Sequence, residues 1–375
     1  MIEIVEVKTK KQIKEFANFP LKHFKDCPYY VPSILSDEIN IFNPKKNFRL
    51  EKNVLKGFLA YKDGELVGRI AGLINTDHNK LSGKNYVRFS RLNAIDDIEV
   101  FKALISAVEN FGKQCGMQIL HGPWGFTDQD REGLLTYGFD VRSTYSTEYS
   151  YDYYPKNLEK LGFSDQSKWI EYKFDLPDKP DERIARLAQK IKEKHNLTEL
   201  FECYSVRQIM KKYGHQLFDL INESYGDLDG YSPVEGKAVD NVLKQFGTIA
   251  NGKYVSILAD ENDQLVAFGI ALPSIADALI KCKGKLFPFG FINVLKSIKN
   301  PNQIELGLIG VKKSYQNSGV TSVIINRILT NVLKDGITYV ESNPMLENNY
   351  NIHQQWKFIP STVHKKRQTY QKEID

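Results

Sequence analysis

The residues whose types and spacing best suit ligand binding or catalysis lie in the segment 304–321. An apolar strand is predicted at its start, a short polar loop follows, and a helix with apolar residues at helical spacing begins directly afterwards. The N–H groups of such a loop and of the first helical turn lack intrahelical partners, and the helix dipole adds partial positive charge. Gly319 and the short Ser318 leave room for an anion. We therefore expect a pyrophosphate to bind between Gln316 and Thr321.

This segment resembles the acetyl-coenzyme A motif of the GCN5-related N-acetyltransferase (GNAT) superfamily. That motif reads Gln/Arg-x-x-Gly-x-Gly/Ala after an apolar strand, and Gln316 and Gly319 occupy its first two fixed positions. Thr321 departs from the third position, where its side chain would either crowd the pyrophosphate or donate to it. The resemblance implies acetyl-CoA as co-substrate. The residues that it assigns to acetyl-CoA are Ile309, Val311, Gln316, Asn317, Ser318, Gly319, Val320, Thr321 and Asn349.

The resemblance also implies the catalytic groups. Family members often use a carboxylate on this strand to take the proton of the attacking amine, which indicates Glu305. Water is the other possible base. The alternative for Glu305 itself is a structural role as an exposed residue at the end of the strand. Tyr350 is the expected acid for the departing thiolate, and simple packing is its alternative. Glu341 and His353 are further candidates. Such a reaction needs positioning and proton transfer, so we expect no metal.

Two parts of the chain repeat one order of elements. Residues 57–74 read as a strand, an Asp-Gly turn and a second strand, and residues 254–272 read similarly, with LAYKDGELVG aligned to LADENDQLVA. A strand, an amphipathic helix and another strand follow each hairpin. In the first copy they are expected over 86–92, 98–111 and 117–120, and in the second over 304–311, 320–332 and 337–341.

This alternation predicts an α/β (α+β) fold of two tandem GNAT-like domains, each a mixed twisted sheet flanked by helices. Helices are also expected ahead of the hairpins, over 10–19, 32–42, 181–194, 206–224 and 234–246. A polar, proline-interrupted stretch indicates a boundary that separates a degenerate N-terminal domain, 1–165, from an acetyl-CoA-binding domain, 166–375. The strand predicted over 168–174 either belongs to one half or bridges both. A last strand, 365–371, is expected to complete the second half.

The first half lacks the phosphate-binding loop. Its corresponding residues, 91–99, contain no glycine, and three carboxylates at the helix start would repel a pyrophosphate. We interpret this half as structural or substrate-shaping. The stretch 121–135 is expected either to face the second half's site as a recognition loop or to begin a helix with Trp124 and Phe126 buried. The basic run 364–367 is expected to guard a solvated edge strand, with phosphate contact as the alternative.

The composition limits the remaining possibilities. The 375 residues exceed one typical core, and the charge of +5, from 51 basic and 46 acidic residues, argues against a chain-wide nucleic-acid footprint. The four cysteines lack metal-ligand spacing. No signal peptide is visible, and the longest apolar run, 286–295, is interrupted by Pro288 and Gly290. We expect a cytoplasmic monomer or homodimer without nucleic-acid or membrane partners.

Together these features predict an N-acyltransferase. An amine of a small molecule or peptide would attack the thioester of acetyl-CoA directly, in the second half. One alternative is an aminoacyl-tRNA-dependent transferase, whose families also pair two such domains. The other is a catalytically inactive GNAT-like ligand-binding or scaffold protein.

Overall fold

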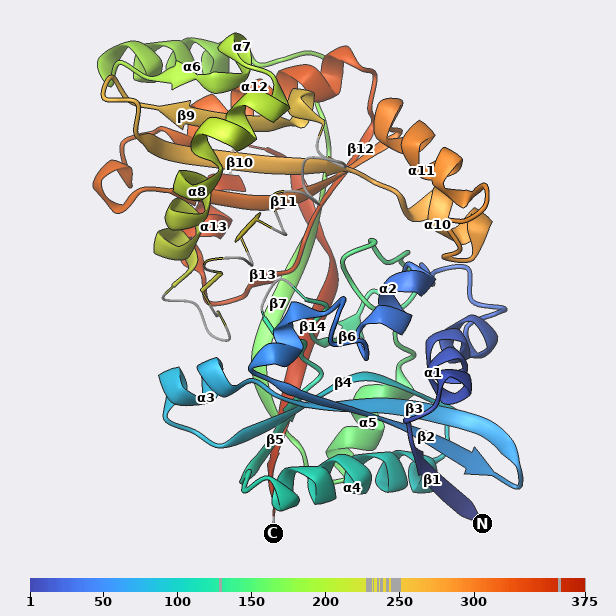
Figure 1. The fold of residues 1–375 in the computed structure, drawn as a ribbon. Helices are drawn as coiled ribbons and strands as arrows, with labels where there is room; N and C mark the ends of the chain where they lie inside the picture. The colour runs from blue at the N-terminus through green and yellow to red at the C-terminus, as the bar shows by residue number, and fades with distance from the viewer. Residues whose placement is uncertain are drawn as a thin grey trace.

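The strands of the two halves form one mixed sheet (Figure 1). The computed structural model describes residues 1–127, 130–226, 231, 233, 234, 236, 239, 240, 243, 251–356 and 359–374. The strands in the first half of the chain are β1 (Ile2–Glu6), β2 (Val54–Lys62), β3 (Glu65–Ile74), β4 (Tyr86–Ala94), β5 (Ile119–Gly122), β6 (Leu134–Tyr137) and β7 (Ser164–Phe174). Those in the second half are β8 (Thr198–Glu199), β9 (Val255–Ala259), β10 (Leu265–Pro273), β11 (Gln303–Val311), β12 (Tyr339–Ser342), β13 (Met345–Leu346) and β14 (Ser361–Glu373).

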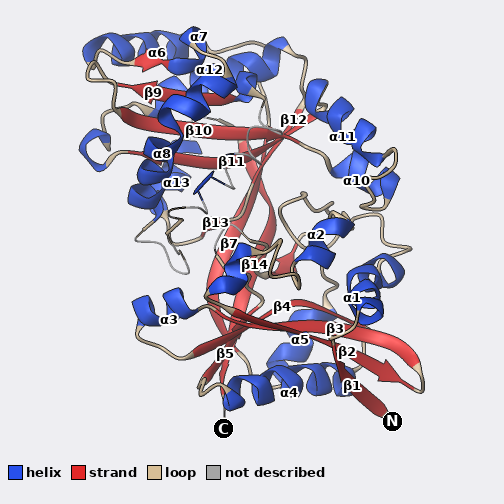
Figure 2. Cartoon of the chain, viewed as in Figure 1, coloured by secondary structure: helices blue, strands red, loops and turns tan. Residues whose placement is uncertain are grey.

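Helices lie on both faces of this sheet (Figure 2). In the first half they are α1 (Lys10–His23), α2 (Leu35–Asn40), α3 (Thr76–Ser82), α4 (Ile98–Gln114) and α5 (Tyr153–Lys160). In the second half they are α6 (Glu182–Lys194), α7 (Leu200–Cys203), α8 (Val206–Tyr225), α10 (Ala276–Cys282), α11 (Gly290–Lys299), α12 (Thr321–Lys334) and α13 (Tyr350–Gln355). Three 3-10 turns are η1 (Phe48–Glu51), η2 (Gly252–Tyr254) and η3 (Lys313–Tyr315).

The internal repeat expected from the sequence is confirmed. The hairpin β2–β3 leads to β4, α4 and β5, and the hairpin β9–β10 leads to β11, α12 and β12. In both copies the hairpins are antiparallel, whereas β4–β5 and β11–β12 pair in parallel. A helix between two parallel strands packs back on the sheet, because its apolar stripe needs a partner. The predicted helix over 234–246 lies mostly outside the described residues.

The two halves exchange their last strands. The sheet order is β1-β2-β3-β4-β5-β14-β7-β12-β11-β10-β9-β8, with β6 attached to β14 and β13 to β7. β14 therefore lies beside β5 of the first half, with Tyr370 opposite Gly122. β7 lies beside β12 of the second half, with Phe174 opposite Val340. The strand predicted over 168–174 bridges the halves, and the expectation that the last strand completes the second half is wrong.

A second correction concerns the basic run 364–367. β14 is an interior strand with β7 on one side and β5 and β6 on the other, so it is not a solvated edge. Lys365 and Arg367 are 0% and 1% exposed. Buried cations require nearby anions, and the carboxylates that meet them come from β7 and β12.

No helix in the described part of the chain is long and apolar enough to cross a membrane.

Candidate functional site

A cavity of about 480 Å³ lies where β11 and β12 separate. The two strands pair from Gln303, opposite Tyr339, to Leu306, opposite Ser342. Beyond that point β11 continues, while the segment that follows β12 turns away at Asn343 and pairs with β7 as β13. Asn343 still donates its backbone N–H to the Leu306 carbonyl at 3.0 Å. The separation opens a space that side chains from both faces of the sheet surround.

The wall of this cavity is largely apolar. Helix α8 covers one face of the second half's sheet and α12 covers the other, and both contribute aliphatic side chains. Aromatic rings from β7 and from the end of α13 add to the wall. The principal apolar side chains are Leu217, Phe218, Ile221, Ile270, Leu272, Leu306, Leu308, Ile324, Ile325, Ile328, Phe174 and Trp356. Such a surface suits a ligand with a substantial hydrocarbon portion.

Polar groups from the first half meet the cavity. Asp130, Glu132, Tyr145 and Ser146 line it, and the Ser146 hydroxyl donates to the Asn343 side-chain oxygen at 2.7 Å. Asp130 accepts two hydrogen bonds from Arg49 at 2.6 and 2.7 Å. Burial would raise the pKa of Asp130, but the Arg49 charge outweighs it and holds that pKa below its usual value. Asp130 is therefore ionised at neutral pH.

The stretch 121–135 has features of both expectations, although no helix begins among its described residues, 121–127 and 130–135. Trp124 and Phe126 are buried, as in the structural alternative. Asp130 and Glu132 lie at the cavity of the second half, as a recognition loop requires. The stretch connects the first half to the cavity without contributing an open aromatic surface.

Glu305 is a buried carboxyl beside the cavity. It is 5% exposed, and the Ser274 hydroxyl donates to it at 2.6 Å. Burial raises its pKa to about 7 and the Glu341 carboxylate contributes, against the opposing effects of Ser274 and Lys365. Its own side chain does not line the cavity, but the next residue, Leu306, does. Glu305 therefore has a pKa in the range of a general base near neutral pH, and its neighbour on β11, Leu306, lines the cavity.

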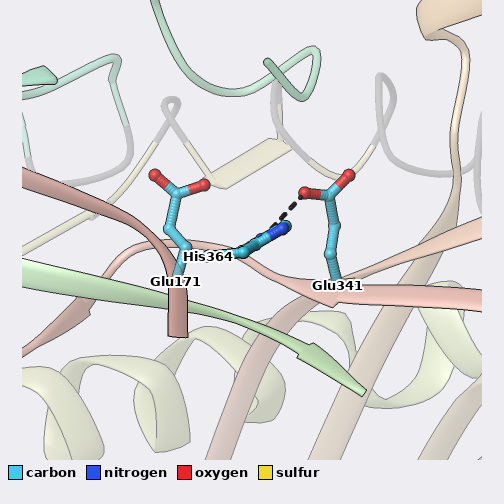
Figure 3. A group of neighbouring side chains, drawn as sticks. All are labelled: Glu171, Glu341 and His364. Carbon is cyan, nitrogen blue, oxygen red and sulfur yellow. Dashed lines mark ion pairs between the residues drawn. The ribbon is translucent and has the colours of Figure 1, made fainter. Parts of the chain in front are cut away.

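A buried charge cluster adjoins Glu305. Ligand atoms of Glu171, Glu341 and His364 lie within 4.8 Å of one another, which is close enough for a metal (Figure 3). The Lys365 ammonium, however, lies 2.9 Å from Glu171 and 2.7 Å from Glu341. Burial would raise the pKa of Glu171, but Lys365 and Arg367 lower it to about 2. Side-chain cations thus supply the positive charge that these carboxylates require.

His364 belongs to this cluster as a neutral ring. Its Nε2 atom lies 3.4 Å from Glu341, the contact drawn as a dashed line in Figure 3. Burial, and then the charge of Lys365, lower the pKa of His364 to about 4. The ring consequently adds no charge near pH 7.

The loop before α12 has the backbone expected of an anion site. Gly319 has φ +86°, and Asn317 has φ +61°, so both lie in the left-handed region. Among the described residues, the N–H groups of Asn317, Gly319, Val320 and Thr321 donate no hydrogen bond. A Cβ at Gly319 would lie 3.1 Å from Ile191 Cδ1, so packing also explains this glycine.

Ile309, on the strand that enters this loop, contacts a tyrosine. Tyr225, the last residue of α8, accepts from the Ile309 N–H at 3.1 Å and donates to its carbonyl at 3.0 Å. Both residues line the cavity. The backbone groups that would receive a ligand along β11 are therefore already engaged at this position.

The equivalent strand of the first half, β4, is likewise bonded by tyrosines, at its last residue. Tyr153 donates to the carbonyl of Ala94, the last residue of β4, at 2.8 Å. Tyr154 accepts from the Ala94 N–H at 3.0 Å. Both tyrosines come from α5, which follows β5 as α13 follows β12. Tyrosine hydroxyls therefore bond the backbone of the equivalent strand in both halves.

Comparisons with known proteins agree with this architecture. No family model matches the chain. It is 27% identical to protein YghO of Escherichia coli (strain K12) over 375 residues, 97% of this chain and 94% of that protein. It is 25% identical to a bacterial ceramide synthase of Caulobacter vibrioides (strain NA1000 / CB15N) over 330 residues, 84% of this chain and 82% of that protein.

A solved structure decides the fold. A tandem GNAT protein from the clavulanic acid biosynthesis pathway matches with a TM-score of 0.58 and 11% identity, over 100% of this chain and 99% of that one. The chain has the tandem GNAT fold. The fold class expected from the repeat and from the loop motif is therefore confirmed.

Within the tandem GNAT fold, the assigned co-substrate residues fall into two groups. Ile309 and Asn349 line the cavity, and Asn349 also caps α13 by accepting from the Ile352 N–H at 3.4 Å. Val311 and the loop 316–321 do not line it. The assignment of the pyrophosphate to this loop stays a prediction, as do the domain limits at 165 and 166.

Tyr350 has a different environment from Glu305. It is 73% exposed and is not part of the cavity wall, so its expected role as an acid stays a prediction. Sequence reasoning missed Tyr225, Ser146 and the aliphatic wall. The apolar spacing of α8 marked a buried face, but nothing in it distinguished a cavity from a packed core.

Proposed function

We propose that the protein is an N-acyltransferase that transfers a long acyl chain from a coenzyme A thioester to the amine of a long-chain acceptor. The apolar cavity of about 480 Å³ at the β11–β12 separation carries this proposal, because an acetyl group alone would not need it. The tandem GNAT fold supports thioester-dependent acylation. A ceramide is the amide of a fatty acid and a long-chain amino alcohol, and one relative is named a ceramide synthase.

The proposed reaction is direct attack at the thioester carbonyl. The amine nitrogen forms a C–N bond to that carbon, the C–S bond breaks, and the leaving thiolate finally takes up the proton that the nitrogen has lost. The ammonium formed on attack gives its proton to Glu305, which has a pKa of about 7. Because Glu305 does not line the cavity, this step requires water to carry the proton between them.

The acidic residues at the cavity suit an amine acceptor. Asp130 and Glu132 place carboxyl groups in a largely apolar wall. Carboxylates at this position favour the approach of an amine acceptor, which carries positive charge when it is protonated. The hydrocarbon part of the acceptor or donor would then lie along the wall formed by α8 and α12.

The test compares chain lengths on both substrates. Purified full-length protein is given palmitoyl-CoA or acetyl-CoA with sphinganine or a peptide amine, and amide products are measured by mass spectrometry. We expect N-palmitoyl sphinganine to form fastest. Faster transfer from acetyl-CoA would restore the acetyltransferase prediction, and no product with any pair would favour the inactive alternative.

A variant inside the cavity sharpens this test. Ile221→Trp fills space on the α8 side and should lower palmitoyl transfer more than acetyl transfer. Leu187→Trp on the half-exposed face of α6 is the matched control. Equal loss of both activities in Ile221→Trp would argue against an acyl chain at this wall.

A further inference from the structure

An exposed apolar surface projects from the second half at α10 and α11. Phe287 and Phe289, in the connection between the helices, are 81% and 72% exposed. Phe291, Ile292 and Leu295 continue the surface along the outer side of α11 and are also exposed. Figure 1 shows the two helices at the flank of the upper half. We name these five residues the α10–α11 apolar surface.

The segment is held in place by its inner side. Leu279 of α10 is buried, and Val294 of α11 packs against the same core. The Leu35 N–H donates to the Gly284 carbonyl at 2.9 Å, which ties the connection to the first half. A Cβ at Gly290 would lie 2.0 Å from the Lys285 carbonyl oxygen, so the chain turns tightly there. The exposed rings are therefore presented by a packed element.

Positive charge surrounds this apolar surface. The exposed lysines of the segment 276–302 are Lys281, Lys283, Lys285, Lys296 and Lys299. The single acidic residue there, Asp277, forms an ion pair with Arg142. Aromatic and aliphatic side chains flanked by lysines match a bilayer surface, where the rings enter the acyl boundary and the cations meet lipid phosphates.

We propose that the α10–α11 apolar surface docks the protein on an anionic lipid bilayer. A second copy of the chain is a poorer occupant, because a symmetric contact would bring two sets of five lysines together. The sequence predicts no membrane partner, because the apolar run 286–295 is too short and too interrupted to span a bilayer. Peripheral docking requires no spanning helix.

The surface is connected to the cavity wall. Tyr145 lines the cavity and packs against the core that contains Leu279 and Val294. If the proposed function holds, this placement brings the cavity close to a membrane that stores long-chain substrates. Docking itself does not depend on that function, because the exposed rings and lysines are sufficient for it.

Vesicle sedimentation tests the proposal with the full-length protein. Phosphatidylcholine vesicles with and without phosphatidylglycerol are used, at low and high salt. We expect binding to the anionic vesicles that weakens in high salt. Phe287→Ser with Phe289→Ser should reduce binding about a hundredfold, and Lys281→Gln with Lys283→Gln and Lys285→Gln by a similar factor. Leu81→Ser on α3, which is 69% exposed, is the matched control and should bind as wild type does.

Several results would overturn the proposal. These are wild-type protein that stays in the supernatant, equal binding to neutral and anionic vesicles, and serine variants that sediment like wild type. Light scattering provides a further check: a wild-type dimer that the serine variants convert to monomer, without vesicle binding, would make the surface an interface between copies. Acyl transfer to detergent-dispersed substrate should be unchanged in the serine variants, so a failure of docking is distinguishable from a failure of the proposed function.

Discussion

The hydroxyl of Tyr225 bonds both backbone groups of Ile309, accepting from the N–H at 3.1 Å and donating to the carbonyl at 3.0 Å. Any ligand that bonds to this part of β11 must first displace that hydroxyl. Displacement breaks two hydrogen bonds, each worth about 1 kcal/mol. A donor that binds along β11 would thus compete with Tyr225 for the backbone N–H and carbonyl of Ile309.

Tyr225→Phe should strengthen donor binding. The Ile309 groups become available without displacement, so we expect a several-fold lower Kd for palmitoyl-CoA by calorimetry. The free energy of unfolding of the unliganded protein should fall by about 1–2 kcal/mol, because two backbone groups lose their partner. Weaker donor binding in the variant would show that the tyrosine holds the ligand.

Glu305→Gln should change both catalysis and stability. With Glu305 as base, wild-type kcat/KM should rise as pH passes through about 7, and the glutamine variant should lose about 10²- to 10⁴-fold and that dependence. The pKa of Glu305 is raised above 4.5, so its contribution to stability is complete below pH 4.5 and is lost as pH rises through 7. Thermal unfolding should therefore show the variant more stable than wild type at pH 8, by up to roughly 3 kcal/mol. An unchanged pH profile in the variant would exclude Glu305 as the base.

Lys365→Met should destabilise the fold strongly. It leaves the Glu171 and Glu341 carboxylates without the ammonium that lies between them, and losing one member of a buried pair costs roughly 3–5 kcal/mol. Adding Glu341→Gln should recover part of the loss. The neighbouring Lys366→Met, half exposed and 3.8 Å from Glu347, should change denaturant stability by less than about 1 kcal/mol. An equal loss of denaturant stability in Lys365→Met and Lys366→Met would contradict the role of Lys365 in neutralising this cluster.

Gln316→Glu tests the phosphate-binding loop without disturbing its backbone. Gln316 is exposed, and a carboxylate there should repel a pyrophosphate and weaken CoA binding about tenfold, with a stronger effect at low salt. Gln114→Glu, at the exposed end of α4, makes the same chemical change far from the loop and should leave CoA binding unchanged. Equal affinity in both variants would place the pyrophosphate elsewhere. Substituting Gly319 is less informative, since its φ of +86° strains any other residue.

The elements were predictable because their signals are local. The Asp-Gly turn at Asp63 and the apolar spacing of α4 identify their own structures, and the structure confirms both. The loop motif predicts a site on β11; Leu306 and Ile309 of that strand line the cavity, whereas the loop 316–321 does not. The repeated order of these elements, together with the loop motif, was sufficient to predict the tandem GNAT fold.

The long-range pairings were not predictable. A basic run such as 364–367 has the local composition of a solvated strand, and the carboxylates that neutralise it, Glu171 and Glu341, belong to other strands. The sequence of the run itself therefore gives no sign of these carboxylates. The cavity depends likewise on α8, α12 and β7 meeting at one place, and the aliphatic spacing of each element is the same for a void as for a filled core.

The exchanged strands have a consequence for synthesis. A chain usually completes its first domain while later residues are still being made. Here β14 is the neighbour of β5, so the sheet of the first half cannot close until residues 361–373 have been translated. The edge of β5 stays open during that interval, which makes nascent protein vulnerable to strand addition by another chain. Low temperature or a chaperone during expression should therefore improve the yield of this protein more than added ligand does.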